Sequence, residues 1–159
     1  MIELKWNCTK LQVTISMLLS LLILLSILSY TDVYKRIIPN KLNVLILILT
    51  LAAAALNDTT MWSDIAFRFG IVLIPLITLY AVGAMGAGDV KLICALVPII
   101  PLNALIDFCF YMAVLGALLA VVVLLYLKRT PSAHHRTVPY GVAISGAIFI
   151  LAAQGKLLI

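Results

Sequence analysis

The sequence has little charge and few acidic residues. Only 11% of its 159 residues are charged, and Asp and Glu together number six. Hydrophobic residues instead make up 65% of the chain, and its mean hydropathy is +1.22. A soluble domain of this length could not keep so much apolar surface away from water. The composition therefore excludes an ordinary soluble protein and predicts an all-α, polytopic membrane protein.

The sequence also lacks the usual marks of a metal site, a disulfide framework or a nucleic-acid surface. Cys8, Cys94 and Cys109 show no CxxC spacing. His134 and His135 have no third ligand at metal spacing, so we expect a solvated loop pair and no metal. The net charge is +5, but no aromatic-plus-basic pattern accompanies it, and we predict no nucleic-acid partner. The basic residues of a membrane chain instead report its orientation.

Apolar runs recur along the whole chain. The first carries no charge and has the roughly 20 residues that a spanning helix needs. A signal peptide explains it less well, because the run is long and five more apolar stretches follow. We therefore expect one integral membrane domain over residues 1–159, in contact with the lipid bilayer, with about six transmembrane helices. These cover Leu11–Tyr30, Leu42–Leu56, Ile65–Val82, Val90–Pro101, Phe108–Leu127 and Val138–Gly155.

The fourth run is too short to span a bilayer. Its 12 residues reach roughly 18 Å as a helix, against a hydrocarbon core of about 30 Å. Either the helix continues past Pro98 and Pro101 with a kink, or the preceding glycine-rich stretch dips into the membrane. Both versions place Asp89 near a helix N-terminus beside an aqueous pocket.

The distribution of lysine and arginine predicts that both termini lie outside. Cytoplasmic loops carry an excess of these residues. With the N-terminus outside, seven face the cytoplasm (Lys35, Arg36, Lys41, Lys91, Lys128, Arg129, Arg136) and four face outward (Lys5, Lys10, Arg68, Lys156). Lys5 and Lys10 argue mildly against this orientation. It places Asp32 and Asp89 together on the cytoplasmic side.

Asp32 and Asp89 each lie next to the end of an apolar run. Acids in a membrane chain are expensive and are read by default as functional. Two carboxyls that share a site cannot both ionise easily, so one stays protonated. The ionised one can take a proton from attacking water, and the protonated one can hydrogen-bond the developing oxyanion. Their spacing alone equally allows two loop aspartates at helix ends.

The direction of each predicted helix suggests which of the two acids is ionised and which is protonated. Asp32 follows the C-terminal end of the first predicted helix, where the dipole disfavours a carboxylate. Asp89 stands at the N-terminal end of the fourth, where free N–H groups favour one. This predicts Asp89 as the ionised base and Asp32 as the protonated acid, although Lys35, Arg36 and Lys91 each favour ionisation of the nearer acid.

The residues around the two acids resemble the type IV prepilin peptidase family, which comprises polytopic aspartic endopeptidases of the bacterial inner membrane. The motifs D-x-x-x-R-x-I-P-N and G-x-G-D-V-K are present as Asp32, Arg36, Ile38, Pro39 and Asn40, and as Gly86, Gly88, Asp89, Val90 and Lys91. Pro139, Tyr140 and Gly141 look like the family's proline–aromatic–glycine segment at the start of the last helix.

The resemblance implies a reaction and a substrate class. Asp32 and Asp89 would be catalytic, with water as the nucleophile and no cofactor. The substrates would be prepilin or pseudopilin precursors, cleaved at the cytoplasmic face after a glycine that ends a basic leader. Pilus assembly or secretion machinery would be a possible partner. The methyltransferase region of larger members, with its paired CxxC motifs, is missing, so the chain resembles the peptidase-only members of tight-adherence (Tad/Flp) pilus systems and N-methylation is not expected.

The resemblance also assigns supporting residues. Motif support would come from Gly86, Gly88, Lys91, Arg36, Pro39 and Asn40, and substrate binding from Lys35, Arg36, Pro139, Tyr140 and Gly141. Lys35 and Arg36 are better explained as ordinary positive charges of an inner loop, where lysine and arginine are expected. We expect Gly88 to be required, because a β-branched residue could not readily adopt φ > 0 and would crowd Asp89.

A small proton-coupled transporter or channel subunit is the alternative function. Intramembrane aspartates and broken helices are also features of transporters. A transporter has no evident need, however, for Arg36, Pro39 and Asn40 beside its acid.

Overall fold

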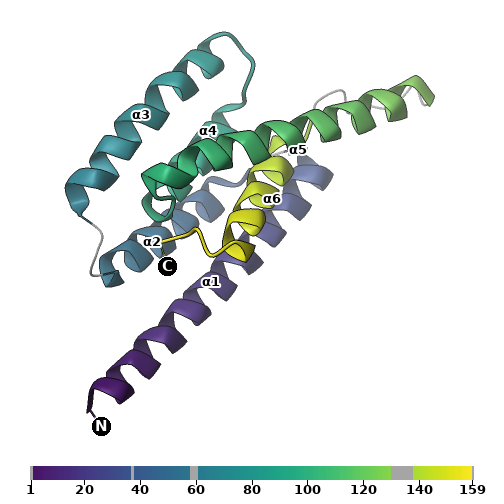
Figure 1. Ribbon diagram of the computed structural model, residues 1–159. Helices are drawn as coiled ribbons and strands as arrows, with labels where there is room; N and C mark the ends of the chain where they lie inside the picture. Colours follow the sequence, from purple (N-terminus) through teal and green to yellow (C-terminus); the bar gives the residue numbers. More distant parts are fainter. Residues whose placement is uncertain (1, 37, 58–60, 130–137, 159) are drawn as a thin grey trace.

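The computed structural model describes residues 2–36, 38–57, 61–129 and 138–158. These residues form six α-helices and one 3-10 turn, and none of them lies in a strand (Figure 1). The elements are α1 (Ile2–Lys35), α2 (Asn40–Leu56), α3 (Trp62–Ala81), α4 (Ala87–Leu96), η1 (Val97–Ile99), α5 (Leu102–Arg129) and α6 (Tyr140–Ala153). The all-α prediction is confirmed.

Three helical segments in the described part of the chain are long and apolar enough to cross a membrane. They are Gln12–Lys35, Trp62–Ala81 and Leu102–Tyr126. Helices α2 and α6 are also apolar but have only 17 and 14 residues. The structure thus supports a membrane protein, while six spans and external termini stay predictions.

Helix α1 extends further than its hydrophobic pattern predicts. It continues past Tyr30 to Lys35, so Asp32 lies in its last turn and not in a following loop. The helix ends where Arg36 adopts a φ of 53° and donates its backbone N–H to the carbonyl of Asp32 at 3.0 Å. A left-handed residue at this position is a common way to stop a helix. The prediction was wrong because hydropathy marks the apolar stretch and not the end of the hydrogen-bonded helix.

The region after Asp89 does not form the long kinked helix that was one of the two alternatives. Helix α4 ends at Leu96, and the 3-10 turn that contains Pro98 follows. The buried Arg68 of α3 binds this end, because its guanidinium donates to the carbonyl of Ile100 at 2.5 Å and to the backbone oxygen of Asp64 at 3.1 Å. Arg68 is therefore a buried residue with a structural role, and the side of the membrane on which it lies stays a prediction.

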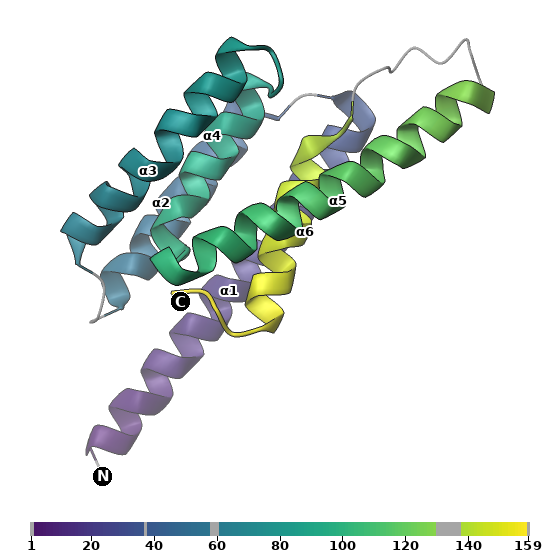
Figure 2. The ribbon, with the colours of Figure 1, turned by 45° about the horizontal axis from the view of Figure 1, so that its top comes forward.

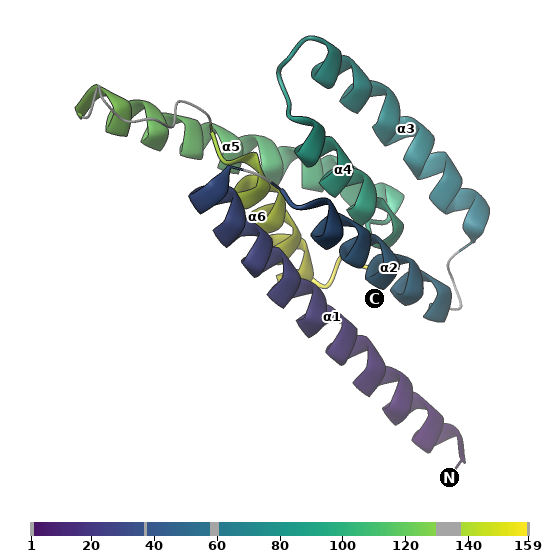
Figure 3. The same cartoon turned by 180° about the vertical axis from the view of Figure 1, so that it is seen from behind.

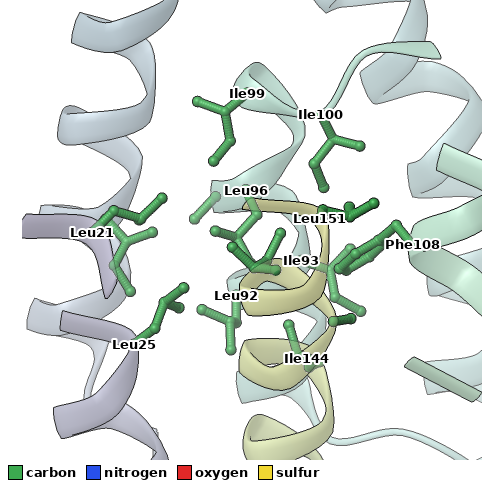
Figure 4. Close-up of a cluster of buried hydrophobic side chains, with 14 of the residues drawn as sticks. Leu21, Leu25, Leu92, Ile93, Leu96, Ile99, Ile100, Phe108, Ile144 and Leu151 are labelled. Carbon is green, nitrogen blue, oxygen red and sulfur yellow. The ribbon is translucent and has the colours of Figure 1, made fainter. Parts of the chain in front are cut away.

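The helices pack as two groups of three. Helix α6 lies between α1 and α5, and α4 packs between α2 and α3 (Figures 1 and 2). The groups meet where α1 contacts α2 and where the two central helices, α4 and α6, contact each other; Figure 3 shows α1, α2 and α6 from behind. The core fills this junction with aliphatic side chains, including Leu25 of α1, Leu92 of α4 and Ile144 of α6, each fully buried (Figure 4).

Candidate active site

Asp32 is held by a helix that begins more than a hundred residues later in the chain. Its side chain is only 6% exposed. Its Oδ2 accepts a hydrogen bond of 2.8 Å from the backbone N–H of Gly141. Gly141 is the second residue of α6, where backbone N–H groups have no partner within the helix. The N-terminus of α6 therefore binds the carboxyl of Asp32, and its dipole favours a negative charge there.

Gly141 cannot be replaced without disturbing this contact. A Cβ atom at this position would lie 2.8 Å from Oδ2 and 3.1 Å from Cγ of Asp32, and 3.1 Å from Leu28 Cδ2. Pro139 is buried as the N-cap of α6, and the half-buried ring of Tyr140 packs near Gly116 of α5. The segment 139–141, proposed from the sequence to bind substrate, thus forms the start of α6 and contacts Asp32.

Asp89 occupies the first turn of α4. Its Oδ2 accepts the backbone N–H of Gly86, the N-cap residue, at 3.3 Å. Burial raises the pKa of Asp89 and the nearby charge of Asp32 raises it further, to about 6, against a smaller lowering by the Gly86 hydrogen bond. Asp89 therefore holds its proton more tightly than an ordinary aspartate, and the two acids lie near enough to interact.

The two aspartate motifs contact each other. Lys91 Nζ donates to Asn40 Oδ1 at 3.1 Å. A Cβ atom on Gly88 would lie 3.2 Å from Cβ of Ile38. Gly88 lies in α4 without a positive φ, whereas Gly83, in the turn before it, has a φ of 73°. The expected reason for Gly88 was thus partly wrong: the close approach of Ile38 explains it and φ does not.

The other predicted residues differ in burial and position. Lys35 is exposed and Arg36 is half-buried, while Pro39 is the N-cap of α2. His134 and His135 lie outside the described residues. Within the described ranges, no three His, Cys, Asp or Glu side chains gather as a candidate metal site.

Sequence reasoning missed Asn43. This α2 residue is 5% exposed, and its Nδ2 donates to the carbonyl oxygen of Gly88 at 3.4 Å. A signal was present, because Asn43 and Thr50 are polar residues seven positions apart in an otherwise apolar run. That spacing places both side chains on one helix face.

Comparison with known families agrees with this geometry. The model of the type IV leader peptidase family matches residues 19–121, a stretch that contains both aspartates and more than half of the chain. The match ends before Gly141. No curated protein and no solved structure matches the chain.

Proposed function

The chain belongs to the type IV leader peptidase family, and we propose that Asp32 and Asp89 are the catalytic pair of an aspartic endopeptidase. The observation that carries the proposal is that the buried Asp32 of α1 and the half-buried Asp89 of α4 lie near enough for the charge of Asp32 to raise the pKa of Asp89. Membership in a peptidase family favours this function over a transporter. We assign cleavage alone to the chain.

The surroundings of the two acids suggest their roles. Burial disfavours a charge at both. At Asp32 this cost is partly offset by the 2.8 Å bond from Gly141, by the N-terminus of α6 and by the positive charge of Arg36. Asp89 has a longer bond from Gly86 and a pKa of about 6. We therefore assign the ionised base to Asp32 and the protonated acid to Asp89.

This assignment reverses the one from helix direction. That prediction considered only the helix that carries each acid. Asp32 does lie at the C-terminal end of α1, where the dipole opposes its charge, but its carboxyl also meets the N-terminus of α6. The direct 2.8 Å hydrogen bond from Gly141 and the positive dipole end of α6 both oppose the unfavourable dipole of α1.

The chemical steps follow from these protonation states. Asp32 accepts a proton as the oxygen of water bonds to the scissile carbonyl carbon, and Asp89 hydrogen-bonds the developing oxyanion. When the C–N bond breaks, the proton on Asp32 passes to the amine nitrogen. The pair then returns to its starting state, so the enzyme needs only water and substrate.

The substrates we propose are prepilin-like precursors with a basic leader, a glycine and then an apolar helix, cleaved after the glycine at the cytoplasmic face of a bacterial inner membrane. The family supports a leader peptide as the general substrate class. The apolar helices supply a membrane setting in which such a precursor helix can lie beside the enzyme.

The test is cleavage of such a precursor by membrane fractions, read as a gel shift. Asp32→Asn and Asp89→Asn should each abolish processing while the protein still inserts. Asp107→Asn is the control, because Asp107 is another aspartate, ion-paired with Lys156 at 2.6 Å. Near-normal cleavage by either variant would contradict the proposal that Asp32 and Asp89 act as a catalytic pair.

A further inference from the structure

We propose that Asn43 is a positioning residue that holds Asp89 in register with Asp32; this inference rests on the proposed function. Asn43 lies in the first turns of α2, and its Nδ2 donates to the carbonyl oxygen of Gly88 at 3.4 Å. That carbonyl belongs to the peptide unit that joins Gly88 to Asp89. A shift of this peptide therefore moves the backbone of Asp89 directly.

Asn43 carries a polar atom that packing alone does not require. Its Oδ1 is buried and has no hydrogen-bond donor among the residues that the structure describes. The amide orientation that satisfies the Gly88 carbonyl leaves this oxygen unpaired, and an unpaired buried acceptor costs stability. Sequences keep such local costs mainly at functional sites.

Helices α2 and α4 are joined by a second hydrogen bond of the same kind, which leaves no unpaired amide oxygen. Thr50 lies seven residues after Asn43, and Ala95 lies seven residues after Gly88. The hydroxyl of Thr50, 1% exposed, donates to the carbonyl of Ala95 at 2.7 Å. Helices α2 and α4 are thus joined twice by a side chain of α2 and a carbonyl of α4, and the junction beside Asp89 uses the asparagine.

The position of Asp89 depends on these contacts because Asp32 is fixed independently. Gly141 holds Asp32 from α6, whereas the start of α4 contacts Ile38, Asn40 and Asn43 from the segment around α2. The Asn43 bond is long, and hydrogen bonds of a catalytic site often tighten only when substrate is bound. Misplacement of a catalytic group by about 1 Å can cost about 100-fold in rate.

The experiment compares Asn43→Val with Asn43→Thr, two side chains of nearly equal shape that differ by one hydroxyl. The detergent-solubilised variants are assayed for kcat and KM on the prepilin-like substrate, with melting temperature as a measure of folding. We expect Asn43→Val to lose kcat by about tenfold or more with KM changed less than about twofold. Asn43→Thr should stay within about threefold of wild type, because its hydroxyl can donate to the Gly88 carbonyl as Thr50 does to Ala95.

Thr50→Val is the matched control, since it removes the other α2–α4 hydrogen bond. It should lower the melting temperature at least as much as Asn43→Val, which also removes the unpaired Oδ1, while keeping kcat. Equal kcat for Asn43→Val and Thr50→Val, or equal losses in Asn43→Val and Asn43→Thr, would overturn the proposal. If Asn43→Val does not fold, Asn43→Ser against Asn43→Ala gives the same comparison. An inactive wild type or an active Asp89→Asn would instead contradict the proposed function.

Discussion

At the scale of residues, the candidate site depends on glycines, because a side chain at these positions would crowd neighbouring groups. Gly141 leaves room for the carboxyl of Asp32, Gly88 for Ile38, and Gly86 for the carboxyl of Asp89, which would lie 3.0 Å from an added Cβ. None of the three has a positive φ. Close approach is therefore the shared reason for these glycines.

Replacing Gly141 tests this directly. Gly141→Ala should reduce cleavage by about 100-fold or more, because the methyl group would displace Asp32 and break its hydrogen bond. Gly146→Ala is the control, since its Cβ would meet a neighbour at the same 2.8 Å, but there the atom is the methyl end of Leu115. Equal activity of the two variants in the cleavage assay would show that the contact with Asp32 has no catalytic role.

The pKa of Asp89 predicts the direction of the pH profile. As the acid, Asp89 must be protonated, and its pKa is about 6. The value of kcat/KM should therefore fall as pH rises above about 6, approaching tenfold per pH unit. Activity that instead rises through pH 6 would assign the base to Asp89. The measurement is a series of initial rates from pH 4 to pH 9 in one detergent.

At the scale of elements, much of the helix content was readable from the sequence, but the helix ends were not. The apolar runs correctly indicated helices around residues 42–56 and 65–82. They placed the end of the first helix before Asp32, because charge and aromatic residues end an apolar run without breaking backbone hydrogen bonds. One of the two alternatives had the helix continue past Pro98 with a kink, but α4 ends at Leu96 and Pro98 lies in a 3-10 turn whose end is bound by Arg68.

The candidate site was predictable only in part for the same reason. The local motifs identified Asp32 and Asp89 as candidates, and the structure brings these two near each other. The contact of Gly141 with Asp32 joins residues 109 positions apart, so no local pattern could state it. The role of α6 depended on how the elements pack, and this changed the expected division between acid and base.

The hydrogen bond from Arg68 to the carbonyl of Ile100, at the end of η1, gives a prediction about stability. Arg68→Leu should lower the free energy of unfolding by about 1–3 kcal/mol, because it leaves the Ile100 carbonyl without its charged donor. The kcat of the folded fraction should stay near wild type, since Arg68 lies in α3 at the far end of α4 from Asp89. Thermal melting and kcat on the same preparation separate the two effects. A large loss of kcat with unchanged melting would contradict a structural role.

At the scale of the whole molecule, the two groups of helices each carry one acid of the proposed catalytic pair. Asp32 belongs to the group of α1, α5 and α6, and Asp89 belongs to the group of α2, α3 and α4. The central helices, α4 and α6, each present an N-terminus to one of the acids. Any movement of one group against the other would therefore change the distance between the carboxyls.

The predicted orientation can be tested on exposed residues around this junction. In a cysteine-free background, Lys35→Cys and Lys91→Cys should react with a membrane-impermeant reagent only from the cytoplasmic side. Lys156→Cys should react from outside intact cells. All three lysines are exposed, so they report more reliably than the buried Asp32. Labelling of Lys35→Cys or Lys91→Cys from outside would reverse the topology.

In the proposed mechanism, α6 keeps Asp32 ionised while Asp89 carries the proton. Infrared difference spectroscopy at pH 5, with each aspartate isotope-labelled in turn, measures this directly. Since the pKa of Asp89 is about 6, the protonated-carboxyl band should shift when Asp89 is labelled and stay in place when Asp32 is labelled. A band that shifts on labelling Asp32 but not Asp89 would contradict the claim.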